Sequence, residues 1–271
     1  MAESSSRGNV CISVPWRDKA WLLPHTLDSI VNLDYPKEKL GMRFIVNDCK
    51  DNTFRMLMQF KREFSEKYRF ISIWTFNMGS ASGRGRDGVV VGKNSWHMQL
   101  LKNILRDALS RKDEYWFYMD SDVLLSPDTL RLLVQADKDV IAGMCRYYND
   151  CCEPSNFMVY DPHVDRFGRE FDKKLVLASD TPVKIDLVTG VMLFRYWVAK
   201  KISFYQASKN EYAEDEGAMR DMMKLGVERW IHPWVMCEKI GDVRALESYI
   251  ENTGKKGLNL TNEIERESDG E

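Results

Sequence analysis

The chain has 271 residues, of which 44% are hydrophobic, and this is enough for one large domain with a sizeable core. Its 39 basic and 41 acidic residues leave a formal net charge of −2, which excludes the global basic field of proteins that bind nucleic acid non-specifically. The start of the chain is polar, and no apolar run of about 18 residues occurs. We therefore expect neither a signal peptide nor a membrane span, and a cytoplasmic protein.

Strands and helices alternate in the first part of the chain. Short apolar runs predict strands at 10–16, 40–48 and 69–76. Between them, apolar residues at helical spacing predict helices at 20–33 and 52–68. This alternation predicts a parallel sheet with crossover helices on its faces.

A segment rich in Gly and Ser, residues 77–95, interrupts this pattern and carries Arg84, Arg86 and Lys93. We expect a mobile loop. Its basic residues could close over a diphosphate or an acceptor, or they could simply be solvated. The segment does not lead from a strand into a helix that starts with Lys and Ser or Thr, so it is not a P-loop.

The remaining elements are predicted by the same patterns. Helices are expected at 97–112, 130–138 and 214–226, and strands at 114–123, 139–144, 184–195 and 230–241. An irregular stretch separates these elements and contains a predicted hairpin at 157–168. The six cysteines form no CxxC pair, which argues against a zinc site or a disulfide framework.

The strand at 114–123 ends on two carboxylates, Asp120 and Asp122. Ligands of open α/β sheets bind at the carboxyl ends of the strands, and Asp48 follows another such end. Carboxylates that are partly buried need water, a proton or a cation. Mn²⁺ and Mg²⁺ prefer oxygen ligands and bridge carboxylates to phosphates. The pair therefore predicts a metal site for a diphosphate, and the alternative is a turn in which Asp120 is only a cap.

Several motifs accompany this acidic pair, and most of residues 9–243 lie between the first and the last of them. They are ISVPWRD, VNDCKDNT, QLLKNILRDAL, KIDLVTGVMLF and EYAEDEGAMRDMMKLG. With them the chain resembles the GT-A fold of nucleotide-sugar glycosyltransferases. The run from QLLKNILRDAL to EDEG looks closest to the fungal mannan-type mannosyltransferases and their bacterial and viral relatives.

The resemblance implies an α/β fold. It would be a single Rossmann-like domain with a mostly parallel central sheet, flanking helices and a small additional β region. We expect residues 9–250 to form this domain, with a nucleotide-binding half (9–123) and an acceptor and sugar half (124–250). Residues 1–8 and 251–271 would be a disordered N-terminus and a flexible polar tail.

The strand ends, the loop at 77–95 and the resemblance together indicate the residues that contact a nucleotide-sugar donor. They are Pro15, Trp16, Arg17, Asp48, Arg84, Lys102, Asp120, Ser121, Thr189, Gly190 and Glu216.

A third metal ligand is expected near the end of the last strand, where the mannan-type enzymes place a His. This chain has Glu238 or Lys239 there. Glu238 is preferred because it offers an oxygen ligand to the metal that Asp120 and Asp122 hold, whereas Lys239 could only neutralise the diphosphate. His232 competes, but a lone His in an apolar strand is more often a partly buried structural residue.

Three consecutive carboxylates, Glu214, Asp215 and Glu216, open the predicted helix at 214–226. Acidic residues in a first turn stabilise the helix dipole, which is their structural interpretation. The functional interpretation is catalytic. In an inverting enzyme Asp215, with Glu214 as the second candidate, would act as general base on the acceptor hydroxyl. In a retaining enzyme the same residues would position sugar hydroxyls.

We therefore expect a metal-dependent hexosyltransferase that moves a sugar from a UDP- or GDP-sugar donor to an acceptor hydroxyl. The acceptor could belong to a glycan, a protein, a small molecule or a hydroxymethylated DNA base. One alternative is a nucleotidyl- or phosphoryl-transferase, which would need a further carboxylate and a basic triphosphate cradle. The other is a non-catalytic relative that binds sugar nucleotides.

Overall fold

The computed structural model describes residues 8–78, 93–148, 157–161, 166–169, 173–205 and 214–260. The strands are β1 (Val10–Trp16), β2 (Leu40–Asn47), β3 (Phe70–Phe76), β4 (Tyr115–Met119), β5 (Val123–Leu124), β6 (Val140–Tyr147), β7 (Phe157–Asp161), β8 (Arg166–Arg169), β9 (Val183–Ile185), β10 (Leu187–Val188), β11 (Val191–Arg195) and β12 (Arg229–Lys239). The helices are α1 (Leu23–Val31), α2 (Thr53–Phe64), α3 (Lys93–Asp107), α4 (Thr129–Gln135), α5 (Lys173–Leu177), α6 (Tyr196–Ala199), α7 (Asp215–Lys224) and α8 (Val243–Thr253), with short 3₁₀ helices at Lys37–Lys39 and Ser65–Lys67.

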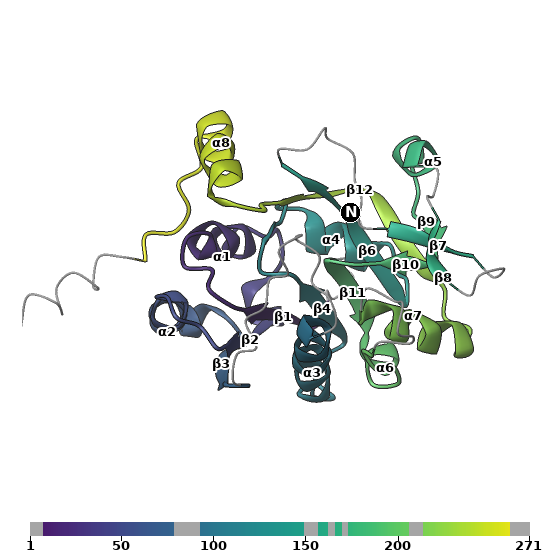
Figure 1. Cartoon of the computed structure of the whole chain (residues 1–271), viewed down its shortest axis with the longest axis horizontal. Coiled ribbons are helices and arrows are strands. Elements are labelled where there is room, and N and C mark those ends of the chain that lie inside the picture. Colours follow the sequence, from purple (N-terminus) through teal and green to yellow (C-terminus); the bar gives the residue numbers. More distant parts are fainter. Residues whose placement is uncertain are drawn as a thin grey trace, which may run out of the picture.

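A large central sheet has the strand order β3-β2-β1-β4-β11-β6-β12-β5, with β9 paired to β12 (Figure 1). Strands β1 to β4 are parallel, as the alternation of elements predicts. Strand β11 runs antiparallel between β4 and β6, whereas β6 and β12 are parallel. The hairpin of β7 and β8 pairs through β7 with β10 and forms the small additional β region.

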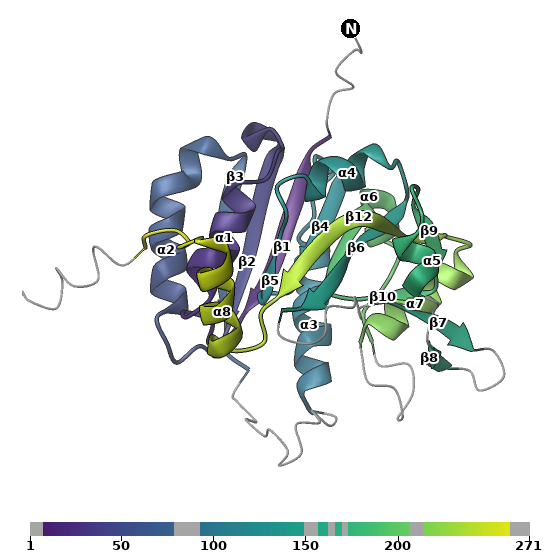
Figure 2. The ribbon, with the colours of Figure 1, turned by 90° about the horizontal axis from the view of Figure 1, so that it is seen from above.

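Helices cover both faces of this sheet (Figures 1 and 2). Side chains of α1, α2 and α4 pack in one buried cluster, which also receives Ile12 and Val14 of β1. Side chains of α3, α6 and α7 pack in a second cluster with Cys11, whose side chain points to the opposite face of the same strand. Alternate side chains of β1 therefore point to opposite faces of the sheet and pack into the two halves of a three-layer α/β/α core.

The predicted strand at 184–195 is wrong as a single element. It is divided into β9, β10 and β11: the chain bends at Asp186 between β9 and β10, and it turns at Gly190, with a left-handed φ of 86°, between β10 and β11. This turn brings Gly190 next to the end of β4, where its carbonyl accepts a hydrogen bond of 2.9 Å from the Asp120 amide.

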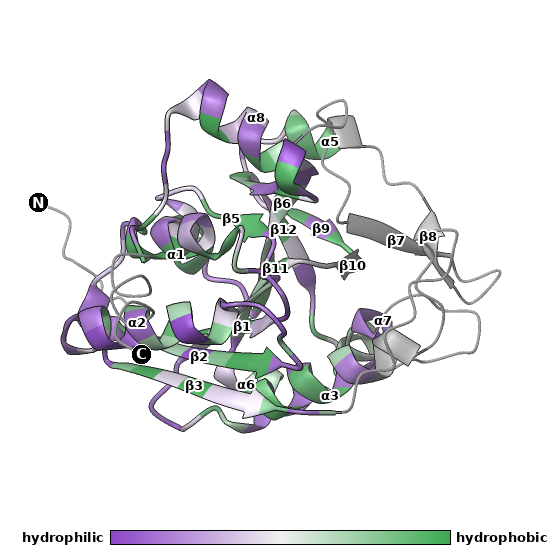
Figure 3. Cartoon of the chain, turned by 60° about the vertical axis from the view of Figure 1, so that its left-hand side comes forward, coloured by the Kyte–Doolittle hydropathy of each residue, from purple (hydrophilic) through white to green (hydrophobic). Residues whose placement is uncertain are grey.

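Helix α8 follows β12 and lies beside α1, where Leu246 packs with Leu22 and Ile240 (Figures 1 and 2). Asp242 caps its start by accepting a hydrogen bond of 2.9 Å from the amide of Ala245. Hydrophilic and hydrophobic residues both occur along this helix, whereas β2 and β3 carry hydrophobic stretches (Figure 3). Among the helices of the described residues, none has the length and apolar character needed to cross a membrane.

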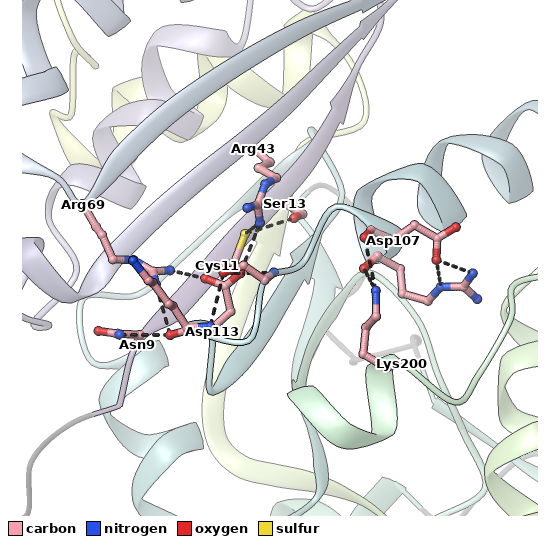
Figure 4. Close-up of polar contacts among 11 residues, drawn as sticks. Asn9, Cys11, Ser13, Arg43, Arg69, Asp107, Asp113 and Lys200 are labelled. Atoms are coloured by element: carbon pink, nitrogen blue, oxygen red, sulfur yellow. Dashed lines mark hydrogen bonds and ion pairs between the residues drawn. The ribbon is translucent and has the colours of Figure 1, made fainter.

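A buried carboxylate, Asp113, holds the amino-terminal side of the parallel strands together (Figure 4). It accepts hydrogen bonds from the amide of Ser110 at 2.8 Å and from Arg43 of β2 at 3.4 Å, and it also pairs with Arg69, the residue before β3. Arg43 in turn lies 2.8 Å from the thiol of Cys11 in β1. One carboxylate thus connects three neighbouring strands just before β4 begins.

Replacement of this carboxylate should destabilise the fold without touching its carboxyl-terminal edge. We expect Asp113→Ala to lower the free energy of unfolding by about 3–5 kcal/mol, because Arg43 and Arg69 lose their buried counter-ion. Asp107→Ala is the matched control, since that side chain is 65% exposed in its pair with Arg106, and it should change stability by less than about 1 kcal/mol. Urea denaturation measures both, and an equal effect of the two variants would contradict the assignment.

Candidate functional site

A cavity of about 410 Å³ opens at the carboxyl-terminal edge of the parallel strands. Its lining brings together most of the residues that the sequence indicated. They are Pro15, Trp16, Arg17, Lys102, Asp120, Ser121, Asp122, Glu214 and Asp215. The cavity also has lining residues that were not among the predicted site residues, namely Lys19, Asn47, His97, Met98 and Leu101.

The backbone around Asp120 and Asp122 crosses from the middle of the sheet to its edge. Strand β4 is buried along its whole length and delivers Asp120 to the cavity. Beyond Asp122 the chain forms β5, in which Val123 pairs with Lys239 of β12. The amide of Ile240 donates a hydrogen bond of 2.8 Å to the carbonyl of Asp122. The two carboxylates are therefore fixed between β4 and the end of β12.

Asp120 is surrounded by groups that stabilise its ionised form. Tyr118 donates a hydrogen bond of 3.3 Å to Oδ1, and Lys239 donates one of 3.2 Å to Oδ2. Burial alone would raise the pKa of Asp120, but the ammonium groups of Lys239 and Lys102 outweigh it and hold the pKa below its usual value. Asp120 is thus an anion ready for a cationic ligand.

Asp122 is less well compensated than its neighbour. Its Oδ1 lies 3.4 Å from Lys239 Nζ, and its Oδ2 lies 4.0 Å from Lys19 Nζ. Burial raises the pKa of Asp122, with the Asp120 carboxylate adding to the effect and Lys239 opposing it. Among the described residues, the buried Oδ1 has its ion pair with Lys239 but no hydrogen bond of good geometry. Two neighbouring carboxylates that supply oxygen ligands fit a hard divalent cation.

The end of β12 presents Lys239, and not Glu238, to the two carboxylates. Successive side chains of a strand point to opposite faces, and Glu238 forms its ion pair with Arg146 of β6. His232 lies further down the strand, where its Nδ1 accepts a hydrogen bond of 3.2 Å from the amide of Trp234. Neither Glu238 nor His232 lines the cavity.

A second cluster of charged side chains, Lys102, Glu214 and Asp215, lines the same cavity. Lys102 of α3 is 2% exposed and lies 2.6 Å from Asp215 and 2.7 Å from Glu214 at the start of α7. The rings of Tyr118 and Phe204 flank its ammonium group at 4.8 and 5.4 Å. Lys102 was predicted to contact the donor, and the structure places its ammonium group on the two predicted catalytic carboxylates.

Because Lys102 supplies one positive charge to two carboxylates, the buried cluster of Lys102, Glu214 and Asp215 has a net negative charge when both carboxylates are ionised. Burial raises the pKa of Asp215 to about 7, with the Glu214 carboxylate adding to the effect and Lys102 opposing it. Burial would lower the pKa of Lys102, but Asp215 and Glu214 outweigh it and raise that pKa, so the lysine stays charged. Asp215 is therefore a carboxylate that exchanges a proton near neutral pH.

The remaining predicted donor residues that the structure describes, Asp48, Thr189, Gly190 and Glu216, do not line the cavity. Asp48 adopts a left-handed φ of 47° and accepts hydrogen bonds of 3.2 and 3.3 Å from the amide of Met78, and the preceding residue, Asn47, lines the cavity. Gly190 is held next to Asp120 by the backbone hydrogen bond described above, and Thr189 directly precedes Gly190 in the chain. Glu216 is buried in the first turn of α7. Arg84 lies outside the described residues.

Sequence reasoning missed Lys19, although a signal for it existed. Lys19 follows the polar loop that ends β1, three residues after Trp16. Its amide donates a hydrogen bond of 2.9 Å to Thr53 Oγ1 at the start of α2, and Asp51 accepts one of 2.9 Å from the amide of Ala20. The loop after β1 is thus bound to the loop after β2, which brings Lys19 within reach of Asp122.

The charge pairing of Lys102 can be tested by stability. Lys102→Met should lower the free energy of unfolding by about 3–5 kcal/mol, because it leaves two carboxylates without their buried cation. The double variant with Asp215→Asn should recover part of this loss, since one of the unpaired charges is removed. Lys19→Met is the control at a lysine that is 21% exposed, with an expected cost below about 1 kcal/mol. Additive effects in a urea-denaturation cycle would contradict the pairing.

Comparison with known proteins gives a family match and distant relatives. The sequence profile of glycosyltransferase family 25, N-terminal domain, matches residues 7–161. Human procollagen galactosyltransferase 2 is 27% identical over 210 residues, which cover 72% of this chain and 32% of the human protein. The mannan polymerase II complex anp1 subunit of Schizosaccharomyces pombe is 29% identical over 149 residues, which cover 51% of this chain and 35% of that protein.

Among solved structures, the crystal structure of S. aureus TarS 1–349 superposes with a TM-score of 0.57 at 13% identity, over 86% of this chain and 60% of that one. The same fragment has also been crystallised in complex with UDP-GlcNAc. This similarity confirms the predicted α/β fold with a mostly parallel central sheet and flanking helices. The matches span about a third of the length of the two relatives described above.

Proposed function

The chain belongs to glycosyltransferase family 25, and we propose that it transfers a hexose from a nucleoside diphosphate sugar to an acceptor hydroxyl. The observation that carries this proposal is the convergence of two separate acidic groups on one cavity. Asp120 and Asp122 come from the end of β4, whereas Glu214 and Asp215 come from the start of α7. A diphosphate and a reacting hydroxyl need two such groups, one on the leaving side and one on the attacking side.

The donor is a UDP- or GDP-sugar in this proposal. The complex of the structural neighbour TarS with UDP-GlcNAc favours UDP over GDP. Pro15, Trp16 and Arg17 at the end of β1, with Asn47 at the end of β2, form the part of the cavity that would hold the nucleoside. Sugar nucleotides bind at this edge in doubly wound α/β folds, where parallel strands end in adjacent loops.

The diphosphate would lie against Asp120, Ser121 and Asp122. A divalent cation, Mn²⁺ or Mg²⁺, held by the two carboxylates would stabilise the negative charge that develops on the leaving group. Lys19 and Lys239 lie at this end of the site and are able to neutralise phosphate oxygens. Glu238 would join the metal ligands only by leaving its ion pair with Arg146.

Asp215 is the proposed general base, with Glu214 beside it. A base must release its own proton before it accepts one from the acceptor hydroxyl, and a carboxylate with a pKa of about 7 does this near neutral pH. Lys102 holds the carboxylate of Asp215 in one position and thereby orients it. The groups that act electrostatically on Asp215 are Lys102, Glu214 and Asp120.

The pH dependence of the reaction follows from this assignment. Because the pKa of Asp215 is raised to about 7, the active deprotonated form should be lost as the pH falls below 7, and kcat/KM should fall roughly tenfold per pH unit there. Asp215→Asn should lower the rate by about 10²–10⁴-fold and remove this limb of the pH profile. Initial rates from pH 5 to 9 with a UDP-sugar measure it, and an unchanged limb in Asp215→Asn would show that another group is the base.

Donor binding is tested by thermal unfolding with a panel of UDP- and GDP-sugars, with and without Mn²⁺. A ligand at 100 times its Kd stabilises the native state by about 2.7 kcal/mol, which corresponds to a shift of roughly 5–10 °C for a chain of this size. Asp120→Ala should lose the shift. Glu228→Gln, at a residue whose side chain is 55% exposed and outside the cavity lining, should keep it.

The outcomes of this screen separate the alternatives. Absence of any shift, with Asp120→Ala behaving like the wild type, would overturn the proposal. A shift without turnover, measured as release of UDP or GDP, would indicate a non-catalytic relative that binds sugar nucleotides. A shift with nucleoside triphosphates alone would favour a nucleotidyl-transferase.

A further inference from the structure

Lys239 occupies the position between the two carboxylates of the acidic pair. Its Nζ lies 3.2 Å from Asp120 Oδ2 and 3.4 Å from Asp122 Oδ1, so that one ammonium group contacts one oxygen of each side chain. A divalent cation that bridges the two carboxylates through these same oxygens would lie about 2.0–2.6 Å from each of them. The ammonium group and a bridging cation therefore compete for one place.

The backbone fixes Lys239 next to this pair. Lys239 pairs with Val123 of β5, and the following amide, that of Ile240, donates a hydrogen bond to the carbonyl of Asp122. The side chain can change its rotamer, but its Cα cannot move away from the acidic pair while β5 and β12 remain paired. The ring of Tyr147 lies 5.8 Å from Nζ on strand β6 and offers the ammonium group a second environment.

The charges around the pair balance without a metal. Asp120 and Asp122 carry two negative charges, and Lys239 and Lys19 carry two positive charges within 4.0 Å of them. A divalent cation added to this group would leave an excess of positive charge in a site that is partly shielded from water. A diphosphate that arrives with the cation supplies the missing negative charge.

We propose that Lys239 is a built-in counter-cation of Asp120 and Asp122, which makes the chain take up a divalent cation only together with a nucleoside diphosphate. In the free protein the ammonium group holds the two carboxylates. When metal and diphosphate enter together, Nζ leaves the carboxylates and neutralises a phosphate oxygen. This inference rests on the proposed function, because it assigns a role to one residue of the same site.

The experiment measures Mn²⁺ binding by calorimetry and by the loss of the free-ion EPR signal, with and without UDP or GDP. Wild-type protein should bind Mn²⁺ weakly alone and at least about tenfold more tightly with the nucleotide, as expected when the nucleotide relieves charge repulsion. Lys239→Gln should bind Mn²⁺ alone about tenfold or more tightly than the wild type and gain less from the nucleotide.

Two control variants isolate the charge of Lys239. Lys239→Arg keeps the positive charge and should keep the weak binding of Mn²⁺ alone. Lys19→Gln removes a lysine that lies 4.0 Å from a single oxygen of Asp122, and it should raise the affinity for Mn²⁺ less than Lys239→Gln does. Circular dichroism of each variant checks that it is folded.

Tight binding of Mn²⁺ to the wild type without nucleotide would overturn the inference, and this measurement needs no variant. Equal affinities of wild type and Lys239→Gln would overturn it as well. If UDP or GDP binds in either case, the proposed function stands and only the role of Lys239 fails. If no nucleotide binds under any condition, the proposed function fails.

Discussion

The site depends on one constraint. The buried central strand β4 ends on two carboxylates, and the chain directly after them forms β5, which pairs with β12 at the edge of the sheet. Strand β4 fixes Asp120, and the pairing of β5 with β12 fixes Asp122 and Lys239 together. Two backbone hydrogen bonds, from the Asp120 amide to the Gly190 carbonyl and from the Ile240 amide to the Asp122 carbonyl, hold the acidic pair to β11 and β12 on its two sides. The positions of the charged groups therefore follow from strand pairing, and each side chain needs only its rotamer to reach its partner.

The order of elements could be predicted because each one carries its own local signal. The runs at β1, β2 and β4 are apolar and end at polar residues, and those ends later converge on the cavity. The strand-end signal indicated Asp120 and Asp122, and the acidic run at 214–216 with the resemblance indicated Asp215; all three line the cavity. Helix α8 was not predicted, although its local signals are present in the sequence: Asp242 at the N-cap and Gly254 at the left-handed C-cap.

Other features could not be predicted because they depend on register or on distant partners. Whether Glu238 or Lys239 faces the acidic pair depends on side-chain alternation along β12, and the pairing of β12 with β6 shifts between His232 and Met236. Because of this irregularity, the alternation of side chains along β12 does not tell from the sequence which face of the sheet Glu238 or Lys239 points to. Similarly, Lys102 meets Asp215 across 113 positions of sequence, and its helix pattern alone does not distinguish a lysine that contacts phosphate from one that orients a carboxylate.

Two lysines of the site, Lys102 and Lys239, differ in how deeply their ion pairs are buried, and this difference separates their roles. Lys102 is 2% exposed between two carboxylates and two aromatic rings, so its removal leaves charges that water cannot reach. Lys239 is 22% exposed, and its carboxylate partners are themselves 22% and 27% exposed, so water or an arriving ion can replace its contacts. A permanent pair orients the proposed base, whereas an exchangeable pair keeps the leaving-group end closed to a lone cation. Both pairs use the same chemistry, and burial alone makes one structural and the other responsive to ligand.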